Sequence, residues 1–191
     1  MTEKEKREAG LLYNANYDPE IASELTKSRD LCFEYNYTLP SNSEKKRDII
    51  NKLLGHVPES ATITSPFWCD LGYNIEVGEN FFSNYNCVML DCAKITFGDN
   101  VFIAPDCGFY TAGHPIDSEC RNKGLEYAHP IVVGNDVWIG GGTKVMPGVT
   151  IGNNVVIAAG SIVTKDIPDN VVAAGVPCKV IRQITEKDKD M

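Results

Sequence analysis

The hydrophobic positions of this chain follow two different periods. In the first sixty residues they are spaced as on one face of a helix, as Ile21 and Leu25 illustrate. From about Ile75 onward they recur every six residues, and each is followed two places later by a second one. This change predicts a helical cap over residues 1–60 and a repetitive β structure over residues 61–184.

Helix-capping signals stand at three places in the helical cap: Thr2 with Glu5, Asp18 before Pro19, and Ser41 with Glu44. A capping side chain accepts a hydrogen bond from a backbone N–H group that the first helical turn leaves unpaired. We therefore expect three helices, the third running from Glu44 to Leu54 and stopping at Gly55.

The sixfold spacing is clearest in the second half of the chain. Residues at sixfold steps there are Ile131, Val137, Thr143, Val149, Val155, Ser161 and Ile167. Two β-branched residues two places apart put both side chains on one face of a short strand, and a glycine-bearing turn follows. The pattern indicates a β-solenoid whose coils bury one another's inner faces. A β-sandwich is the alternative, although its strands alternate over longer runs at irregular spacing.

Composition narrows the classes of function. A net charge of -8 and a pI near 4.9 argue against a nucleic-acid surface, because phosphate binding needs a concentrated positive face. The chain has no apolar run long enough to span a membrane and no apolar segment behind its charged N-terminus, so we expect a cytoplasmic protein. Its seven cysteines form no C-x-x-C pair, and residues 185–191 form a charged tail.

The sixfold rhythm is interrupted at length by a loop at 110–130. Insertions in repeat proteins form loops on one face, often the binding face. This loop contains His114, His129 and several acidic residues. Because an imidazole exchanges a proton near neutral pH, His114 is our candidate general base. Alternatively, it packs against Pro115 as a satisfied polar residue.

The other two histidines have structural interpretations. His56 follows a glycine at a helix end, and His129 precedes Pro130 where the solenoid resumes. A zinc site would need histidines on adjacent coils, and His56 precedes the repeats. We therefore expect no metal.

Several segments resemble the maltose and galactoside O-acetyltransferases: the hexad repeats, Thr111–Pro115, Asn135–Gly141 and Val172–Ile181. The resemblance extends to about Ile184. It implies a mainly β fold, a left-handed parallel β-helix of hexapeptide repeats with an N-terminal helical segment. It also implies acetyl-CoA as co-substrate, no metal, and a homotrimer with active sites between subunits.

The resemblance also implies roles for individual residues. The histidine of the Thr111–Pro115 segment is the general base in this family, and Glu126 corresponds to a position beside it, where it orients the ring or holds acceptor hydroxyls. Asn84 and Asp91 match positions that line the acceptor site, and Asp18, or a nearby asparagine at position 14 or 16, contributes from the helical cap. The alternatives are a solvated carboxylate for Glu126 and a polar ladder or turn for Asn84 and Asp91.

One departure from the family concerns the acceptor. Galactoside-type enzymes have a second acid directly after the aspartate that matches Asp91, and this chain has Cys92 there. Maltose-type enzymes have a small apolar residue at that position. The departure therefore favours a maltose-like acceptor.

By resemblance, coenzyme A binds along the last coils and the tail, at Trp138, Gly141, Ala159, Thr164, Lys165, Lys179 and Arg182. The small residues would let pantetheine lie along the solenoid edge, and the cations would approach phosphate. Alternatively, the cations are ordinary surface charges and Trp138 is a packing residue at a subunit interface.

The sequence thus predicts acetyl transfer from acetyl-CoA to a hydroxyl of maltose, glucose or a related sugar, by direct attack with His114 as base. A xenobiotic O-acetyltransferase on the same fold is one alternative, although such enzymes usually carry a longer loop and lack the helical cap. A non-catalytic solenoid scaffold is the other, and it would need no loop rich in titratable groups.

Overall fold

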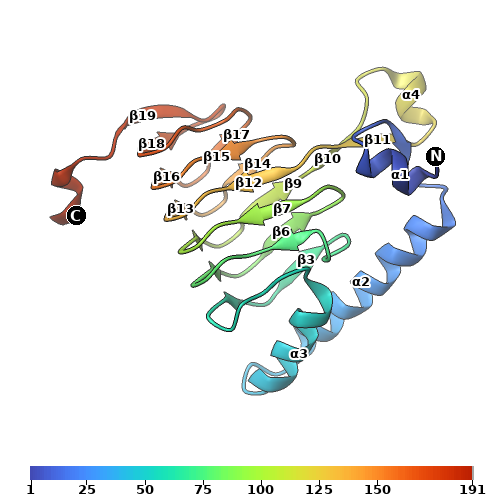
Figure 1. Ribbon diagram of the computed structural model, residues 1–191, viewed down its shortest axis with the longest axis horizontal. Coiled ribbons are helices and arrows are strands. Elements are labelled where there is room, and N and C mark those ends of the chain that lie inside the picture. The colour runs from blue at the N-terminus through green and yellow to red at the C-terminus, as the bar shows by residue number, and fades with distance from the viewer. Residues whose placement is uncertain (191) are drawn as a thin grey trace.

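The computed structural model describes residues 1–190, in which N-terminal helices precede a parallel β-solenoid of about six turns (Figure 1). The predicted fold class, mainly β with hexapeptide repeats and an N-terminal helical segment, is confirmed. The helical elements are α1 (Glu3–Glu8), α2 (Pro19–Tyr37), α3 (Ser43–Leu53), α4 (Ser118–Asn122) and the 3-10 helix η1 (Glu186–Asp190).

Two of the three predicted helix starts are confirmed. Thr2 and Glu5 form a capping box at α1, and Asp18 Oδ1 accepts hydrogen bonds of 3.0 Å from the first amides of α2. The Ser41 prediction is wrong, because Asn42 caps α3 by accepting from the Lys45 N–H group at 3.2 Å. Asparagine places a side-chain oxygen at the same reach, so the helix begins one residue later than a Ser41 cap would set it.

The three faces of the solenoid are three parallel sheets. The four-stranded sheet comprises β15 (Thr150–Ile151), β12 (Ile131–Val133), β7 (Ile95–Phe97) and β4 (Ile75–Glu76). The five-stranded sheet comprises β17 (Ile162–Val163), β14 (Lys144–Val145), β9 (Gly108–Tyr110), β6 (Cys87–Leu90) and β3 (Phe67–Cys69). The seven-stranded sheet comprises β18 (Val171–Ala174), β16 (Val155–Ile157), β13 (Val137–Ile139), β8 (Phe102–Ile103), β5 (Phe82–Ser83), β2 (Thr62–Ile63) and an antiparallel edge strand, β19 (Lys179–Gln183).

The solenoid begins earlier than the Ile75 at which the sixfold pattern becomes visible. Strands β2 and β3 already pair with β5 and β6, as Phe67 does with Cys87. Paired positions are 20 residues apart in these first coils, 18 in a later coil and 16 in the last. Because 20 is not a multiple of six, the first coils break the strict period that reveals the later ones.

The core is a set of aligned aliphatic and aromatic side chains inside the coils. Ile75, Ile95 and Ile131 occupy matching positions in successive coils and are fully buried. At the corner before the seven-stranded sheet, asparagine and aspartate side chains form ladders, such as Asn80 to Asn100 at 3.0 Å. These residues have positive φ, which asparagine tolerates better than most residues. The ladders therefore fix the turn that each hexad needs.

Two corners of the solenoid carry the predicted functional residues. The first corner is where each coil passes from the seven-stranded to the five-stranded sheet, and the second is where it passes from the five-stranded to the four-stranded sheet. Among residues 1–190, no helix is both long enough and apolar enough to cross a bilayer.

Candidate active site

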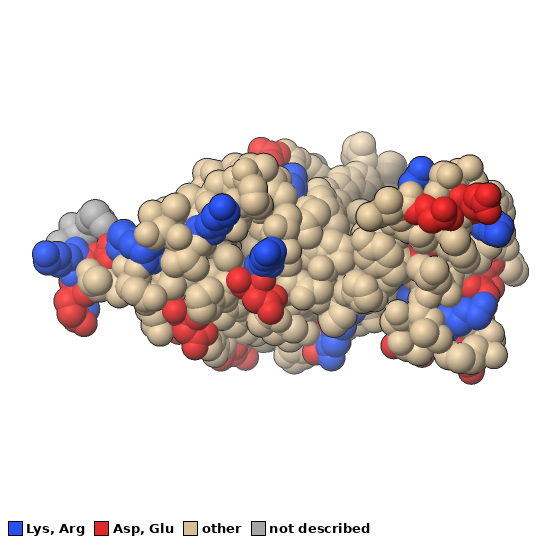
Figure 2. Space-filling view, turned by 90° about the horizontal axis from the view of Figure 1, so that it is seen from above, with Lys and Arg blue, Asp and Glu red and all other residues tan. Residues whose placement is uncertain are grey.

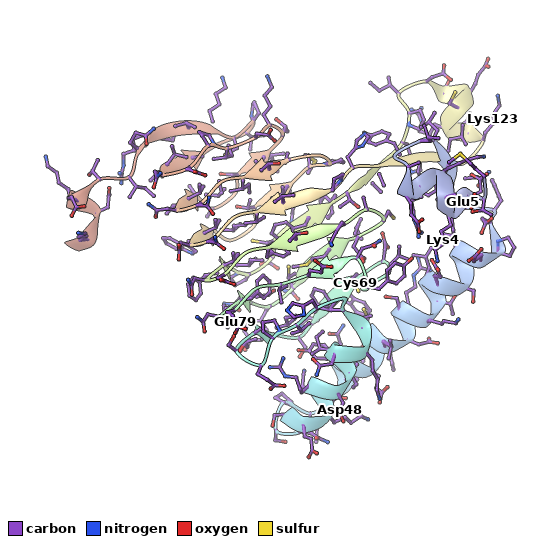
Figure 3. All side chains as sticks on the ribbon, viewed as in Figure 1. Lys4, Glu5, Asp48, Cys69, Glu79 and Lys123 are labelled. Carbon is purple, nitrogen blue, oxygen red and sulfur yellow. The ribbon has the colours of Figure 1, made fainter. Side chains whose placement is uncertain are left out.

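The loop at 110–130 leaves the solenoid at the second corner and is anchored to the N-terminal segment. Strands β10 (Ala112–Gly113) and β11 (Leu125–Ala128) pair antiparallel, and β1 (Tyr13–Asn14) adds to the other edge of β11. Figure 1 shows α1 beside this loop, and Lys123 of the loop lies above Lys4 and Glu5 of α1 in Figure 3. The loop is therefore held in place by a small three-stranded sheet.

His114 directly follows β10 and has a half-exposed side chain. Its Nδ1 atom lies 3.1 Å from the Leu125 carbonyl oxygen, and its Nε2 atom lies 3.7 Å from Glu126 Oε1. A carbonyl oxygen can only accept, so a hydrogen bond there requires the proton on Nδ1. The neutral ring then carries its lone pair on Nε2, which is the arrangement of a general base.

The Glu126 carboxylate is held beside this ring by the helical cap. Its Oε2 atom accepts a hydrogen bond of 3.1 Å from the Tyr13 hydroxyl, and Tyr13 pairs with Glu126 across β1 and β11. Tyr13 is buried, and burial raises the pKa of its hydroxyl, so this group stays a donor. The sequence analysis missed Tyr13 because a two-residue strand leaves no periodic signal.

Asp91 is fully buried at the second corner, away from solvent. Its Oδ1 atom accepts hydrogen bonds from the Asp70 and Leu71 N–H groups at 3.0 and 2.8 Å. Burial raises the pKa of this carboxyl to about 6. These contacts match the alternative in which Asp91 shapes a turn within the coils, rather than the acceptor contact that the sequence predicts for it.

Asp70 and Cys92 lie at the same corner and were not singled out as binding residues. The Cys92 thiol donates to Asp70 Oδ2 at 3.5 Å, and Cys92 packs against the cluster that contains Tyr13. Burial raises the pKa of Asp70, whose side chain is only partly enclosed. Asp70 therefore offers a carboxyl group at the second corner, from which the loop that carries His114 departs.

Two of the three predicted residues of the helical cap contact the loop. The Asn14 side chain donates to the Lys123 carbonyl at 3.2 Å, and that of Asn16 donates to the Gly124 carbonyl at 3.3 Å. Asp18 instead caps α2 through Oδ1.

Other predicted residues lie on a different edge of the same protomer. Asn84, Gly141 and Ala159 occupy the first corner in three different coils. Trp138 projects from the seven-stranded sheet with 56% of its surface exposed, and it pairs in register with the exposed Phe102. Within one protomer, these four residues therefore lie away from the corner that carries His114.

The other residues predicted to bind coenzyme A lie at two separate places. Thr164 and Lys165 are exposed and follow β17 at the second corner, two coils beyond the His114 loop. Lys179 and Arg182 lie on β19, where Arg182 forms a bidentate ion pair with Asp188 at 2.6 and 2.8 Å. This pair lowers the pKa of Asp188.

Arg182 also lies in line with Trp138. Trp138 pairs with Val156, Val156 with Val172, and Val172 with Arg182 across four neighbouring strands. Three strand spacings of about 4.8 Å separate the two ends of this row. In Figure 2, Lys and Arg side chains are scattered and form no broad basic surface. Within residues 1–190, no cluster of three His, Cys, Asp or Glu side chains is arranged to hold a metal ion.

Comparisons with known proteins identify the family of this chain. Residues 6–58 match the maltose acetyltransferase hexapeptide capping motif, and residues 130–165 match the bacterial transferase hexapeptide model. Galactoside O-acetyltransferase of Escherichia coli (strain K12) is 48% identical over 163 residues, which cover 85% of this chain and 80% of that protein.

Solved structures give the same result. A maltose O-acetyltransferase from Clostridium difficile 630 matches with a TM-score of 0.95 and 52% identity, covering 97% of this chain and 99% of that one. A galactoside acetyltransferase in complex with coenzyme A matches with a TM-score of 0.95 and 44% identity, covering 99% of this chain and 94% of that one. The chain therefore belongs to the maltose and galactoside O-acetyltransferase family of hexapeptide-repeat enzymes.

Proposed function

We propose that this chain is a cytoplasmic, homotrimeric enzyme that transfers the acetyl group of acetyl-CoA to a hydroxyl of maltose, glucose or a related sugar. The observation that carries the proposal is the fixed His114 ring, with Nδ1 at the Leu125 carbonyl and Nε2 free beside Glu126. A half-exposed imidazole held in one tautomer has the geometry that a hydroxyl-activating base requires.

The reaction proceeds by direct attack. His114 Nε2 takes the proton of the sugar hydroxyl as its oxygen forms a bond to the thioester carbonyl carbon. The tetrahedral intermediate then collapses, the carbon–sulfur bond breaks, and the imidazolium returns the proton to the departing thiolate. The products are the sugar acetate and coenzyme A. The proton that leaves the sugar hydroxyl ends on the thiol of coenzyme A, so the reaction needs no further reactant.

Glu126 stabilises the protonated, positively charged form of the base. When His114 takes the proton, its Nε2 carries an N–H group and the ring becomes a cation, 3.7 Å from the Glu126 carboxylate. A nearby carboxylate stabilises that cation, while the Leu125 carbonyl at Nδ1 keeps the ring oriented, as the aspartate does at the same nitrogen in a catalytic triad. The Tyr13 hydroxyl in turn fixes the carboxylate.

Coenzyme A is proposed to lie along the outer row from Trp138 to Arg182. Its extended form suits a row of this length, with the phosphates near Lys179 and Arg182 and the thioester toward Trp138. Gly141 and Ala159 leave space at the adjoining corner, and Thr164 and Lys165 contact the cofactor from a second chain. The coenzyme A complex of the similar galactoside acetyltransferase supports coenzyme A as the ligand.

A homotrimer follows from the separation of the two halves of the site. His114 and Glu126 depart from the second corner, whereas Asn84 and Trp138 lie at the first corner and on the seven-stranded sheet. If the second corner of one subunit meets the seven-stranded sheet of the next, both halves face a shared cleft. Trp138 and Phe102, two exposed aromatic side chains in adjacent strands, would then be covered by the partner, and aromatic residues are enriched at such interfaces.

The acceptor is proposed to bind between Asn84 of one subunit and the cap side of the other. Asp18 has a second carboxylate oxygen that its cap bonds do not use. Asp70 and Cys92 at the second corner add one further carboxylate and a less polar wall. A less acidic pocket than the galactoside type favours a maltose- or glucose-like acceptor.

An acceptor screen that monitors thiol release tests the proposal. With acetyl-CoA present, maltose or glucose should release free coenzyme A faster than galactosides do, and mass spectrometry should find one added acetyl group on the sugar. Release with hydroxylated xenobiotics alone would indicate the alternative enzyme class. Failure to bind acetyl-CoA at all would indicate a scaffold.

A further inference from the structure

Helix α3 and the end of α2 lie at the base of the solenoid (Figure 1). A cavity of about 320 Å³ lies between these helices and β2. Its walls include Tyr35, Lys46, Arg47, Ser65 and Tyr85. Its lining lies at the first corner, in the first coils, where Tyr85 directly follows Asn84, whereas the His114 loop leaves the second corner further along the solenoid. The volume falls within the range of small-molecule sites.

Lys46 reaches into this cavity without a carboxylate partner. Its Nζ atom donates to Ser65 Oγ at 2.7 Å and lies 4.3 Å from the centre of the Tyr35 ring. Both contacts are to neutral groups, and partial burial lowers the pKa of the ammonium group. The adjacent Lys45, by contrast, pairs with Glu34 at 2.9 Å.

Arg47 supplies a second positive charge on the same wall. Its guanidinium donates to the Pro58, Glu59 and Ala61 carbonyls at 3.3, 3.2 and 2.8 Å. Among residues 1–190, neither Lys46 nor Arg47 forms an ion pair, and the walls of the cavity include no aspartate or glutamate. A chain of net charge -8 thus encloses two cations with no opposing acid in this cavity.

The remaining walls show what kind of anion would fit. Hydroxyl groups of Ser43, Thr62, Thr64 and Ser65 can donate to an oxyanion, and Ile50, Val57 and the Tyr35 ring provide an apolar side. Lysine is a compact charge that binds phosphate well, and a partly desolvated ammonium gains most from an anionic partner. We propose that this cavity binds a small phosphomonoester, with the phosphate at Lys46 and its organic part against the apolar side.

The proposal is tested by calorimetric titration of the full-length protein with glucose 6-phosphate, with inorganic phosphate and with glucose. We expect saturable binding of glucose 6-phosphate and weaker binding of inorganic phosphate. Glucose should bind only at the proposed acceptor site, so Lys46→Met should leave its titration unchanged. Lys46→Met keeps the length of the side chain and removes the charge, so affinity for glucose 6-phosphate should fall at least about tenfold. Lys45→Met is the matched control and should bind as the wild type does.

Three further variants separate this site from the proposed transfer site. Binding should persist in His114→Ala, in Asn84→Ala and in Lys165→Ala, because those residues serve acetyl transfer, the acceptor and coenzyme A. Loss in Asn84→Ala or in Lys165→Ala with retention in Lys46→Met would place the ligand in the acceptor site or the coenzyme A site and overturn the proposal. Absence of saturable binding to the wild type, or equal loss in Lys45→Met and Lys46→Met, would also overturn it. Thermal unfolding of each variant confirms that it is folded.

Discussion

The Tyr13 hydroxyl donates a hydrogen bond of 3.1 Å to Glu126 Oε2, which joins the N-terminal segment to the loop that carries His114. The carboxylate therefore depends on a residue more than a hundred positions away in sequence for its orientation. The cap of this fold does more than cover the end of the solenoid, because it contributes a partner to the proposed catalytic pair.

Tyr13→Phe should lower kcat about tenfold while leaving KM for acetyl-CoA unchanged. The substitution removes one hydrogen bond to a carboxylate and preserves the buried ring, so the loss concerns the orientation of Glu126. Steady-state kinetics measure this effect. Tyr35→Phe is the control, because the Tyr35 hydroxyl donates to the Ile63 carbonyl far from the loop. Equal kcat losses in both variants would argue against a role for Tyr13 in positioning Glu126.

Asp91→Asn should change how stability depends on pH. The pKa of Asp91 is about 6 in the folded chain, above the value of about 3.9 for an unfolded aspartate. The folded state therefore holds the proton more tightly, so this residue makes the protein less stable as pH rises from 4 to 7, by about 2 kcal/mol. Urea unfolding at both pH values should show the wild type losing more stability than the variant. Parallel changes in the two proteins would contradict the burial effect.

Lys165→Ala combined with Arg182→Ala should weaken acetyl-CoA binding far more than acceptor binding. Charge contacts serve only the phosphorylated ligand. Asp188→Asn should act in the opposite direction, because it releases Arg182 from its bidentate ion pair and leaves the guanidinium free for phosphate. Titration of each ligand distinguishes the effects. If both ligands lose affinity equally in the double variant, these residues support the fold instead.

Multi-angle light scattering should find the wild type as a trimer, and Phe102→Glu should dissociate it. Phe102 is 48% exposed in a single chain and lies in register with Trp138. A charge there would be buried without a partner in the proposed cleft. Because each cleft needs two subunits, the dissociated variant should also lose activity. A wild-type monomer with full activity would refute the shared cleft.

The repeat pattern alone predicted much of the fold, because few folds other than a β-solenoid are compatible with β-branched residues at a period of six. The predicted β region began at residue 61, but the sixfold pattern was not visible before Ile75, because the first coils are 20 residues long and carry two residues more than three hexads. The Asn42 cap was also missed, because Ser41 with Glu44 has the better-known spacing.

The site was harder to predict than the fold. The family resemblance implied that Glu126 lies beside His114, and the structure places His114 Nε2 3.7 Å from Glu126 Oε1. Tyr13 and Asp70 come from other segments, and only the folded chain brings Tyr13 to Glu126 and Asp70 to Cys92. The full burial of Asp91 could not be predicted either, because the sequence does not distinguish a turn residue that faces solvent from one that accepts from backbone amides.

The most direct test of the account is the kcat of His114→Ala. His114 is half-exposed and lies outside the repeat positions, so its truncation should open no core cavity and should leave a folded protein that still binds acetyl-CoA. We expect kcat to fall by roughly 10² to 10⁴, the usual contribution of a positioned general base. We also expect the variant to lose the rise of kcat/KM with pH that accompanies deprotonation of the base. A folded variant with near-wild-type kcat would show that another residue is the base and would contradict the mechanism.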